Sequence, residues 1–222
     1  MQSELLTENL LDLSKTIAAD LFEGVNYPFE VLPKIKDYII KLQARLDKNE
    51  FDEIADGVFV HKTTTVAPTA SIAAPCIIDA NTEVRHCAFI RGNAIVGKNC
   101  VVGNSCELKN VVIFDNVQVP HYNYVGDSVL GYHSHMGAGS ITSNVKSDKT
   151  LVTIKCGNTG VETGLKKMGA IIGDYVEIGC NSVLNPGTVI GKNSNVYPLS
   201  MVRGYVEKSS IYKCKNEIIT KK

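Results

Sequence analysis

The sequence predicts a mainly β protein: a parallel β-solenoid preceded by an N-terminal helical segment. Two observations predict the solenoid. From Ile54 to Val102 an Ile or Val recurs every six residues, and the fifth residue of each six-residue window is small or β-branched. Such a fixed period is the signature of a repeat architecture. A third observation, aliphatic residues at helical spacing before residue 50, predicts the helical segment.

Residues 1–50 carry two helical patterns. The aliphatic residues of the first pattern are Leu10, Leu13, Ile17 and Leu21. Thr7 is a candidate cap ahead of them. The second pattern consists of Ile35, Ile39, Leu42 and Leu46, and it predicts an amphipathic helix that opens near Pro33. Both apolar stripes are interpreted as packing surfaces.

The repeat domain is predicted over residues 51–207. Its first windows start at Ile54, Val60, Val66, Ile72, Ile78, Val84, Ile90, Val96 and Val102. Neither a two-residue nor a 3.6-residue period explains this spacing. A short strand plus a corner explains it, with the aliphatic residue in the interior and the small residue where the walls crowd. Cys76, Cys100 and Cys106 then become inward-facing residues with reduced thiols. The odd total of seven cysteines, without a C-x-x-C pair, also argues against disulfides or zinc.

An interruption at residues 142–170 breaks the frame. It is rich in glycine and carries five lysines, namely Lys146, Lys149, Lys155, Lys166 and Lys167. Insertions in solenoids emerge as loops on one face, often the binding face. The alternative is a solvated basic loop. Residues 208–222 are predicted to form a polar, flexible C-terminal tail.

Composition limits the partners. The chain of 222 residues has 23 Lys and Arg against 23 Asp and Glu. Zero net charge removes any global electrostatic argument for nucleic acid or an anionic membrane as partner. The longest nearly apolar stretch, residues 71–78, is too short to span a bilayer, and no secretory signal is visible. We therefore expect a cytoplasmic protein.

Three features suggest chemistry. Arg91 and Lys109 are 18 residues, or three windows, apart, so a coil of three windows would place them on one face of successive coils, about 4.8 Å apart. Their repulsion, about 1 kcal/mol when partly shielded, is relieved by an anion between them; the alternative is two splayed, solvated side chains. His121 is a candidate general base, or a structural histidine. The amides of Gly137–Gly139 are candidate donors to a thioester carbonyl or its oxyanion.

The segment from Arg91 to Asn144 resembles the acetyltransferase domain of the bifunctional glucosamine-1-phosphate acetyltransferase / N-acetylglucosamine-1-phosphate uridylyltransferase family. The matching residues are Arg91, Lys109, His121, Tyr124, Gly126, Asp127, Gly137, Ala138, Gly139 and Asn144. The run 166–174 resembles archaeal-type sugar-phosphate members. The wider hexapeptide-repeat family implies a left-handed parallel β-helix, three hexapeptides per coil, and a homotrimer with sites between neighbouring prisms.

The resemblance implies an acetyl-CoA-dependent N-acetyltransferase acting on an amino-sugar phosphate, with glucosamine 1-phosphate favoured, in nucleotide-sugar synthesis. Arg91, Lys109 and Tyr124 would hold the sugar phosphate. His121 would take a proton from the attacking amine. The Ala138 amide would stabilise the oxyanion, and Asn144 would position the amine.

The cofactor is expected along the later coils. Acetyl-CoA would lie against Ala138, Cys180 and Pro198, with Arg203 or the loop lysines near its phosphates. No resident metal is implied.

Several positions depart from the family pattern. His135 stands where the family has an amide that contacts the sugar. Cys180 and Pro198 replace small residues of the cofactor wall. Lys149 is the best candidate for the loop lysine that contacts the sugar. The glycine-rich nucleotide loop of the nucleotidyltransferase domain is absent from the sequence, so uridylyl transfer is not expected.

Two other classes remain open. Some trimeric left-handed β-helices are γ-class carbonic anhydrases, and His86 and His121 could share a face. However, the expected third ligand is Gly126, and His133 and His135 do not restore the spacing. The other class is a non-catalytic scaffold or regulatory β-helix of the kind appended to nucleotidyltransferases. The joint presence of Arg91, Lys109, His121, Tyr124 and Asn144 argues against that class.

Overall fold

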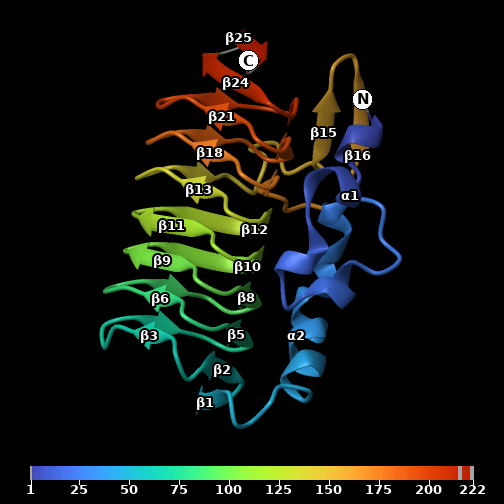
Figure 1. Cartoon of the computed structure of the whole chain (residues 1–222). Coiled ribbons are helices and arrows are strands. Elements are labelled where there is room, and N and C mark those ends of the chain that lie inside the picture. Colours follow the sequence, from blue (N-terminus) through green and yellow to red (C-terminus); the bar gives the residue numbers. More distant parts are fainter. Residues whose placement is uncertain (1, 215–216, 221–222) are drawn as a thin grey trace.

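The computed structural model describes residues 2–214 and 217–220, which form a parallel β-solenoid with an N-terminal helical segment along one side (Figure 1). The predicted fold class is confirmed. Each coil contributes one short strand to each of three walls, and the strands of successive coils pair in parallel.

The three walls are made as follows. The first wall consists of β3 (Thr65–Val66), β6 (Glu83–Val84), β9 (Val101–Asn104), β11 (Gln118–His121), β13 (His135–Met136), β18 (Glu177–Ile178), β21 (Asn195–Val196) and β24 (Ser210–Cys214). The second wall consists of β4 (Ser71–Ile72), β7 (Phe89–Ile90), the first halves of β10 (Glu107–Ile113) and β12 (Tyr124–Leu130), β14 (Ile141–Thr142), β19 (Val183–Leu184) and β22 (Met201–Val202). The third wall consists of β2 (Val58–His61), β5 (Cys76–Ile78), β8 (Ala94–Val96), the second halves of β10 and β12, β17 (Ala170–Ile172), β20 (Thr188–Ile190) and β23 (Tyr205–Val206).

The interior is filled as the six-residue period predicts. Ile78, Ile90 and Leu108 are fully buried in successive coils. Cys76 and Cys100 are buried free thiols, and burial raises the pKa of each to about 12. Both thiols therefore stay protonated at neutral pH and act as small core residues.

The start of the frame differs from the prediction. Ile54 is 53% exposed and lies in β1 (Phe51–Ala55), which pairs antiparallel with β2 instead of forming a coil. An antiparallel hairpin has no interior wall to fill, so Ile54 only coincides with the period. The inward-facing series begins at Val60, which is 4% exposed.

The N-terminal segment contains one of the two predicted helices. Its elements are η1 (Gln2–Leu5), α1 (Thr7–Leu10), η2 (Leu13–Lys15), η3 (Ala19–Phe22), η4 (Pro28–Lys34) and α2 (Ile35–Gln43). The second predicted helix is α2, although Leu46 lies beyond its end. The first predicted helix is wrong: α1 is one turn long, and Thr7 is its first residue instead of its cap. Asp12 and Thr16 accept hydrogen bonds from the backbone of Ser14 and Ala18, which favours short turns over a continuous helix.

This segment covers the outer face of the third wall. On that wall the middle residue of each strand points outward, because neighbouring side chains alternate. From β5 to β20 these outward residues are all buried, namely Ile77, Ile95, Val112, Val129, Ile171 and Val189. The α2 helix contacts β5, β8 and β10, and η4 contacts β12. The third wall is therefore covered on both faces, by the solenoid interior on one side and by the N-terminal segment on the other.

Two later segments complete the chain. The insertion leaves after Asn144 and returns at Met168, whose amide donates to the Asn144 carbonyl. It forms an antiparallel hairpin of β15 (Thr153–Cys156) and β16 (Thr159–Glu162). The segment predicted as a flexible tail differs from the prediction: β24 continues the first wall on β21, and β25 (Glu217–Thr220) pairs with β24. The tail positions 215–216 and 221–222 lie outside the described residues. Within the described chain, every helix is too short or too polar to span a bilayer.

The covered wall generates a stability prediction. Ile95→Ala removes a fully buried side chain between the interior and α2, so we expect the free energy of unfolding to fall by about 2–5 kcal/mol. Ile54→Ala is the control, because Ile54 is exposed. Denaturant unfolding of both variants measures the difference. Equal stability of the two would show that the N-terminal segment does not pack on this wall in solution.

Candidate active site

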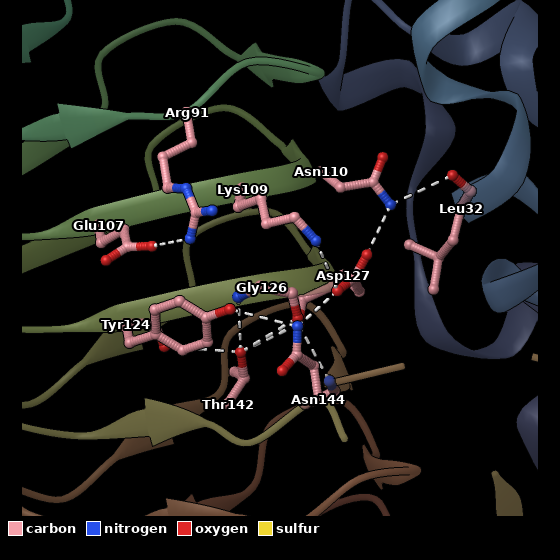
Figure 2. Close-up of polar contacts among 12 residues, drawn as sticks. Leu32, Arg91, Glu107, Lys109, Asn110, Tyr124, Gly126, Asp127, Thr142 and Asn144 are labelled. Carbon is pink, nitrogen blue, oxygen red and sulfur yellow. Dashed lines mark hydrogen bonds and ion pairs between the residues drawn. The ribbon is translucent and has the colours of Figure 1, made fainter. Parts of the chain in front are cut away.

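The outer face of the second wall carries two columns of side chains. Ile90 pairs with Leu108, and Leu108 pairs with Val125, one coil at a time. The residues that follow these three inward-facing positions are Arg91, Lys109 and Gly126, which therefore form the column at the end of the wall. The residues that precede them are Phe89, Glu107 and Tyr124. The structure thus places Arg91 and Lys109 on one face of successive coils (Figure 2).

Each cation of this face is paired with a carboxylate. Arg91 Nη1 lies 2.7 Å from Glu107 Oε1, and Lys109 Nζ lies 3.4 Å from Asp127 Oδ2. The Arg91 pair is largely exposed, so it contributes little to stability. Its main effect is on position, because it holds the guanidinium over the wall (Figure 2). The four groups together carry no net charge.

Asn144 and Tyr124 meet below the cations. Asn144 Nδ2 donates to Tyr124 Oη at 3.2 Å and also to Asp127 Oδ2. Burial and the nearby Asp127 charge raise the pKa of the Tyr124 phenol, so it remains protonated at neutral pH. A Cβ on Gly126 would lie 2.5 Å from Tyr124 Oη and 2.9 Å from Asn144 Nδ2. Only glycine at this position leaves room for the Tyr124–Asn144 contact.

His121 lies at the neighbouring corner, at the end of β11 on the first wall. The buried side chain of Asn123 fixes the backbone there: its Oδ1 accepts from the His121 amide, and its Nδ2 donates to the Gly137 carbonyl. The His121 side chain is exposed and has no hydrogen-bond or ion-pair partner within the described residues. The backbone is therefore fixed, while the imidazole is free to meet a ligand.

The predicted cofactor residues follow His121 coil by coil. The His121 carbonyl accepts from the Gly139 amide, which sets Ala138 beside His121. The Ala138 carbonyl accepts from the Asn181 amide, and the Cys180 carbonyl accepts from the Leu199 amide, which sets Cys180 and Pro198 next in line. His121, Ala138, Cys180 and Pro198 therefore form one column, named here the corner column.

Arg203 lies away from the corner column. It follows Val202 of β22, which pairs with Leu184 of β19, so it belongs to the end of the second wall. There it lines an open pocket of about 720 Å³ together with Lys146, Asp148 and Lys155. A Cβ on Gly204 would lie 2.5 Å from the Lys155 carbonyl, so glycine lets the β15–β16 hairpin pack closely on this corner.

Two predicted substrate residues lie elsewhere in the chain. His135 is in β13 on the first wall, and its Nδ1 lies 2.7 Å from Glu177 Oε2. Lys149 is in the exposed turn before β15. A single chain therefore does not place His135 on the wall that carries Arg91 and Lys109.

Sequence reasoning missed Glu107, Asn110 and the contacts of Asp127. The repeat contained a signal for all three. Glu107 occupies the position before the inward-facing residue, as Tyr124 does in the next coil, and Asn110 occupies the same corner position as Asp127 one coil earlier. The corner geometry favours Asn and Asp there, since both residues have positive φ (54° and 48°).

The set of ligands that a zinc site would need at His86 and His121 is incomplete. His86 and His121 do share a column, with Asn104 between them. In the described part of the chain, no three His, Cys, Asp or Glu side chains gather as metal ligands.

Comparison with known proteins agrees with this geometry. Residues 72–165 match the family described as the GMPPB C-terminal domain, and residues 169–204 match the bacterial transferase hexapeptide family of six repeats. The chain carries a hexapeptide-repeat transferase domain. Hexapeptide repeats imply that this solenoid is left-handed.

The sequence relatives are bifunctional proteins. The chain is 31% identical over 223 residues to the bifunctional protein GlmU of Methanococcus maripaludis strain C5, covering 97% of this chain and 54% of that protein. It is 34% identical over 187 residues to the bifunctional protein GlmU of Methanococcus aeolicus, covering 84% and 45%. The chain thus spans about half the length of these relatives, and it resembles their C-terminal region.

Solved structures are more distant. The polySia-specific acetyltransferase NeuO matches with a TM-score of 0.47 and 14% identity, covering 75% of this chain and 88% of that one. The acetyltransferase domain of PglB from Neisseria gonorrhoeae, in complex with acetyl coenzyme A, matches with a TM-score of 0.30 and 12% identity, covering 85% and 66%. Both TM-scores lie below 0.5, so the assignment rests on the sequence relatives.

Proposed function

We propose that this protein is an acetyl-CoA-dependent N-acetyltransferase that acts on an amino-sugar phosphate, namely glucosamine 1-phosphate, in the synthesis of UDP-N-acetylglucosamine or a related nucleotide sugar. The observation that carries the proposal is the column of Arg91 and Lys109 beside Tyr124 and Asn144, with an exposed imidazole at the next corner. Uridylyl transfer is not part of the proposed activity.

The phosphate is held by the two cations. Arg91 and Lys109 lie one coil apart, about 4.8 Å, which suits a phosphate that contacts both. A phosphate dianion has more charge than either carboxylate and accepts several hydrogen bonds. It therefore replaces Glu107 as the partner of Arg91. Lys109 has three N–H donors, so it can hold a phosphate oxygen and Asp127 together. Tyr124 supports the same phosphate from the adjacent column.

The acetyl transfer then needs a base and an oxyanion donor. The substrate amine is mostly protonated at neutral pH and must lose a proton to attack, and His121 accepts that proton. The nitrogen forms a bond to the thioester carbon, the C–S bond breaks, and CoA leaves as the thiol after protonation. The Ala138 amide stabilises the oxyanion, and Asn144 positions the amine.

Acetyl-CoA lies along the corner column. Its thioester end meets Ala138 beside His121, and its chain continues past Cys180 and Pro198. Its phosphates face Arg203, with the pocket lysines Lys146 and Lys155 as further cationic groups. Lys146 is 3.5 Å from Asp148, whereas no ion pair engages Lys155 or Arg203 within the described chain.

The proposed assembly is a homotrimer. The N-terminal segment covers the third wall, which leaves the first and second walls as the faces for contact between protomers. If the first wall of one protomer faces the second wall of its partner, His135 and the corner column of one chain meet the phosphate site of the next. Lys149 is proposed to reach the sugar from the insertion.

A second candidate is a non-catalytic scaffold or regulatory β-helix. The specific observation in its favour is that Arg91 and Lys109 already have carboxylate partners, which leaves these four groups without net charge. The two candidates differ in turnover, so one assay separates them.

That assay is thiol release from acetyl-CoA with glucosamine 1-phosphate. We expect His121→Ala to lower kcat by about 10²–10⁴-fold with little change in KM, because the base acts in the transition state. His61→Ala is the control, since His61 lies in β2, contacts Thr63 and is outside the site. Wild-type protein that turns over no member of a panel of amino-sugar phosphates would favour the scaffold. Full activity of His121→Ala would remove the proposed base.

The cofactor position predicts selective protection of a thiol. Cys87 and Cys180 are exposed, whereas Cys76, Cys100, Cys106 and Cys156 are buried. We expect a maleimide to label Cys87 and Cys180 in the folded protein, and saturating acetyl-CoA to slow labelling of Cys180 alone. Peptide mass spectrometry measures both rates, with Cys87 as the internal control. Unchanged labelling of Cys180 at saturation would place acetyl-CoA elsewhere.

A further inference from the structure

The carboxylate of Asp127 is the meeting point of the site. Its Oδ1 accepts a hydrogen bond from Asn110 Nδ2 at 2.9 Å. Its Oδ2 accepts from Asn144 Nδ2 and lies 3.4 Å from Lys109 Nζ. Two of these three partners, Lys109 and Asn144, are groups of the proposed phosphate and amine sites, and Figure 2 shows all three converging on Asp127.

Asn110 extends this network to the N-terminal segment. The same Nδ2 that donates to Asp127 lies 3.3 Å from the carbonyl oxygen of Leu32 in η4 (Figure 2). Leu32 is buried, and η4 packs on β12 next to Asp127. The position of the segment on the third wall therefore bears directly on the asparagine that holds Asp127.

The burial of the Asp127 carboxylate has an energetic cost. Asp127 is only 5% exposed, and a buried carboxylate is costly unless it is paired and hydrogen-bonded. Neither the inward packing of the coil nor the corner conformation needs a charge here, because neutral residues, Asn110 and Asn93, occupy the equivalent corners of the two preceding coils with the same positive φ. The partners explain why a carboxylate is present: it holds the Lys109 ammonium and the Asn144 amide in a fixed position relative to each other.

We propose that Asp127 is a positioning residue of the acyl-transfer site and that Asn110 couples it to the N-terminal segment. The proposal rests on the proposed function. Asp127 sets the direction of Lys109 toward the phosphate and of Asn144 toward the amine. Its charge also opposes the phosphate dianion, so the residue improves alignment at some cost in substrate affinity.

This division of roles predicts a split between kcat and KM. In Asp127→Asn the new amide cannot both accept from Asn144 and neutralise Lys109. We expect kcat for glucosamine 1-phosphate to fall tenfold or more through misalignment, while KM stays level or falls because a negative charge has been removed. General damage to the second wall would instead raise KM. A kcat within twofold of wild type, or a raised KM, would overturn the proposal for Asp127.

The coupling has its own matched pair of variants. Asn110 and Asn116 both have positive φ, 54° and 60°, which glycine adopts without strain. Asn110→Gly removes the link between Leu32 and Asp127, whereas Asn116 has no side-chain hydrogen bond within the described residues. We expect a severalfold loss of kcat in Asn110→Gly only, with faster hydrogen–deuterium exchange in peptides covering 28–34 and 124–130.

The exchange measurement separates failure of this proposal from failure of the proposed function. A wild-type protein that acetylates none of the tested sugars refutes the function. The coupling is then decided by exchange alone: faster exchange in Asn110→Gly than in Asn116→Gly supports it, and equal exchange of the two variants overturns it.

Discussion

The interior of the solenoid accepts one register, and every other feature depends on it. Each coil must bring its aliphatic residue under that of the coil before, as Ile90, Leu108 and Val125 do in the second wall. Because side chains alternate along a strand, a slip of one residue would turn these side chains outward and polar ones inward. The burial of apolar side chains in the interior therefore also determines which residues face outward on each wall.

Because of that constraint, spacing in the sequence determines which functional side chains lie next to one another. Positions next to a buried residue form columns on the surface, so residues 17 or 18 apart become neighbours. One column holds Arg91 and Lys109, and another carries His121, Ala138 and Cys180. The column of Phe89, Glu107 and Tyr124 lies between them, at the start of the second wall. A rigid wall suits this use, because catalytic groups are more exactly aligned on strands than on mobile loops.

Much of the fold and part of the site could be predicted from this spacing. The stacked strands and the buried cysteines follow from the six-residue period, and the stacking of Arg91 on Lys109 follows once the hexapeptide-repeat family supplies three repeats per coil. The short turns that replace a helix before Gly24 could not be predicted, because the aliphatic residues there have helical spacing while Asp12 and Thr16 bind the backbone locally. Ile54 matched the period without belonging to a coil. The ion pairs of Glu107 and Asp127 were missed because the period shows which positions are neighbours but not which side chains pair with one another.

The central claim is that the second wall binds a sugar phosphate between its stacked cations. A crystal structure of the protein with glucosamine 1-phosphate and CoA tests it most directly. We expect the phosphorus to lie within contact of both Arg91 and Lys109, with the amine facing an imidazole of His121 and the CoA chain along Cys180 and Pro198. Glucosamine 1-phosphate bound on the first wall or in the Arg203 pocket, with Arg91 and Lys109 still paired with Glu107 and Asp127, would contradict the account.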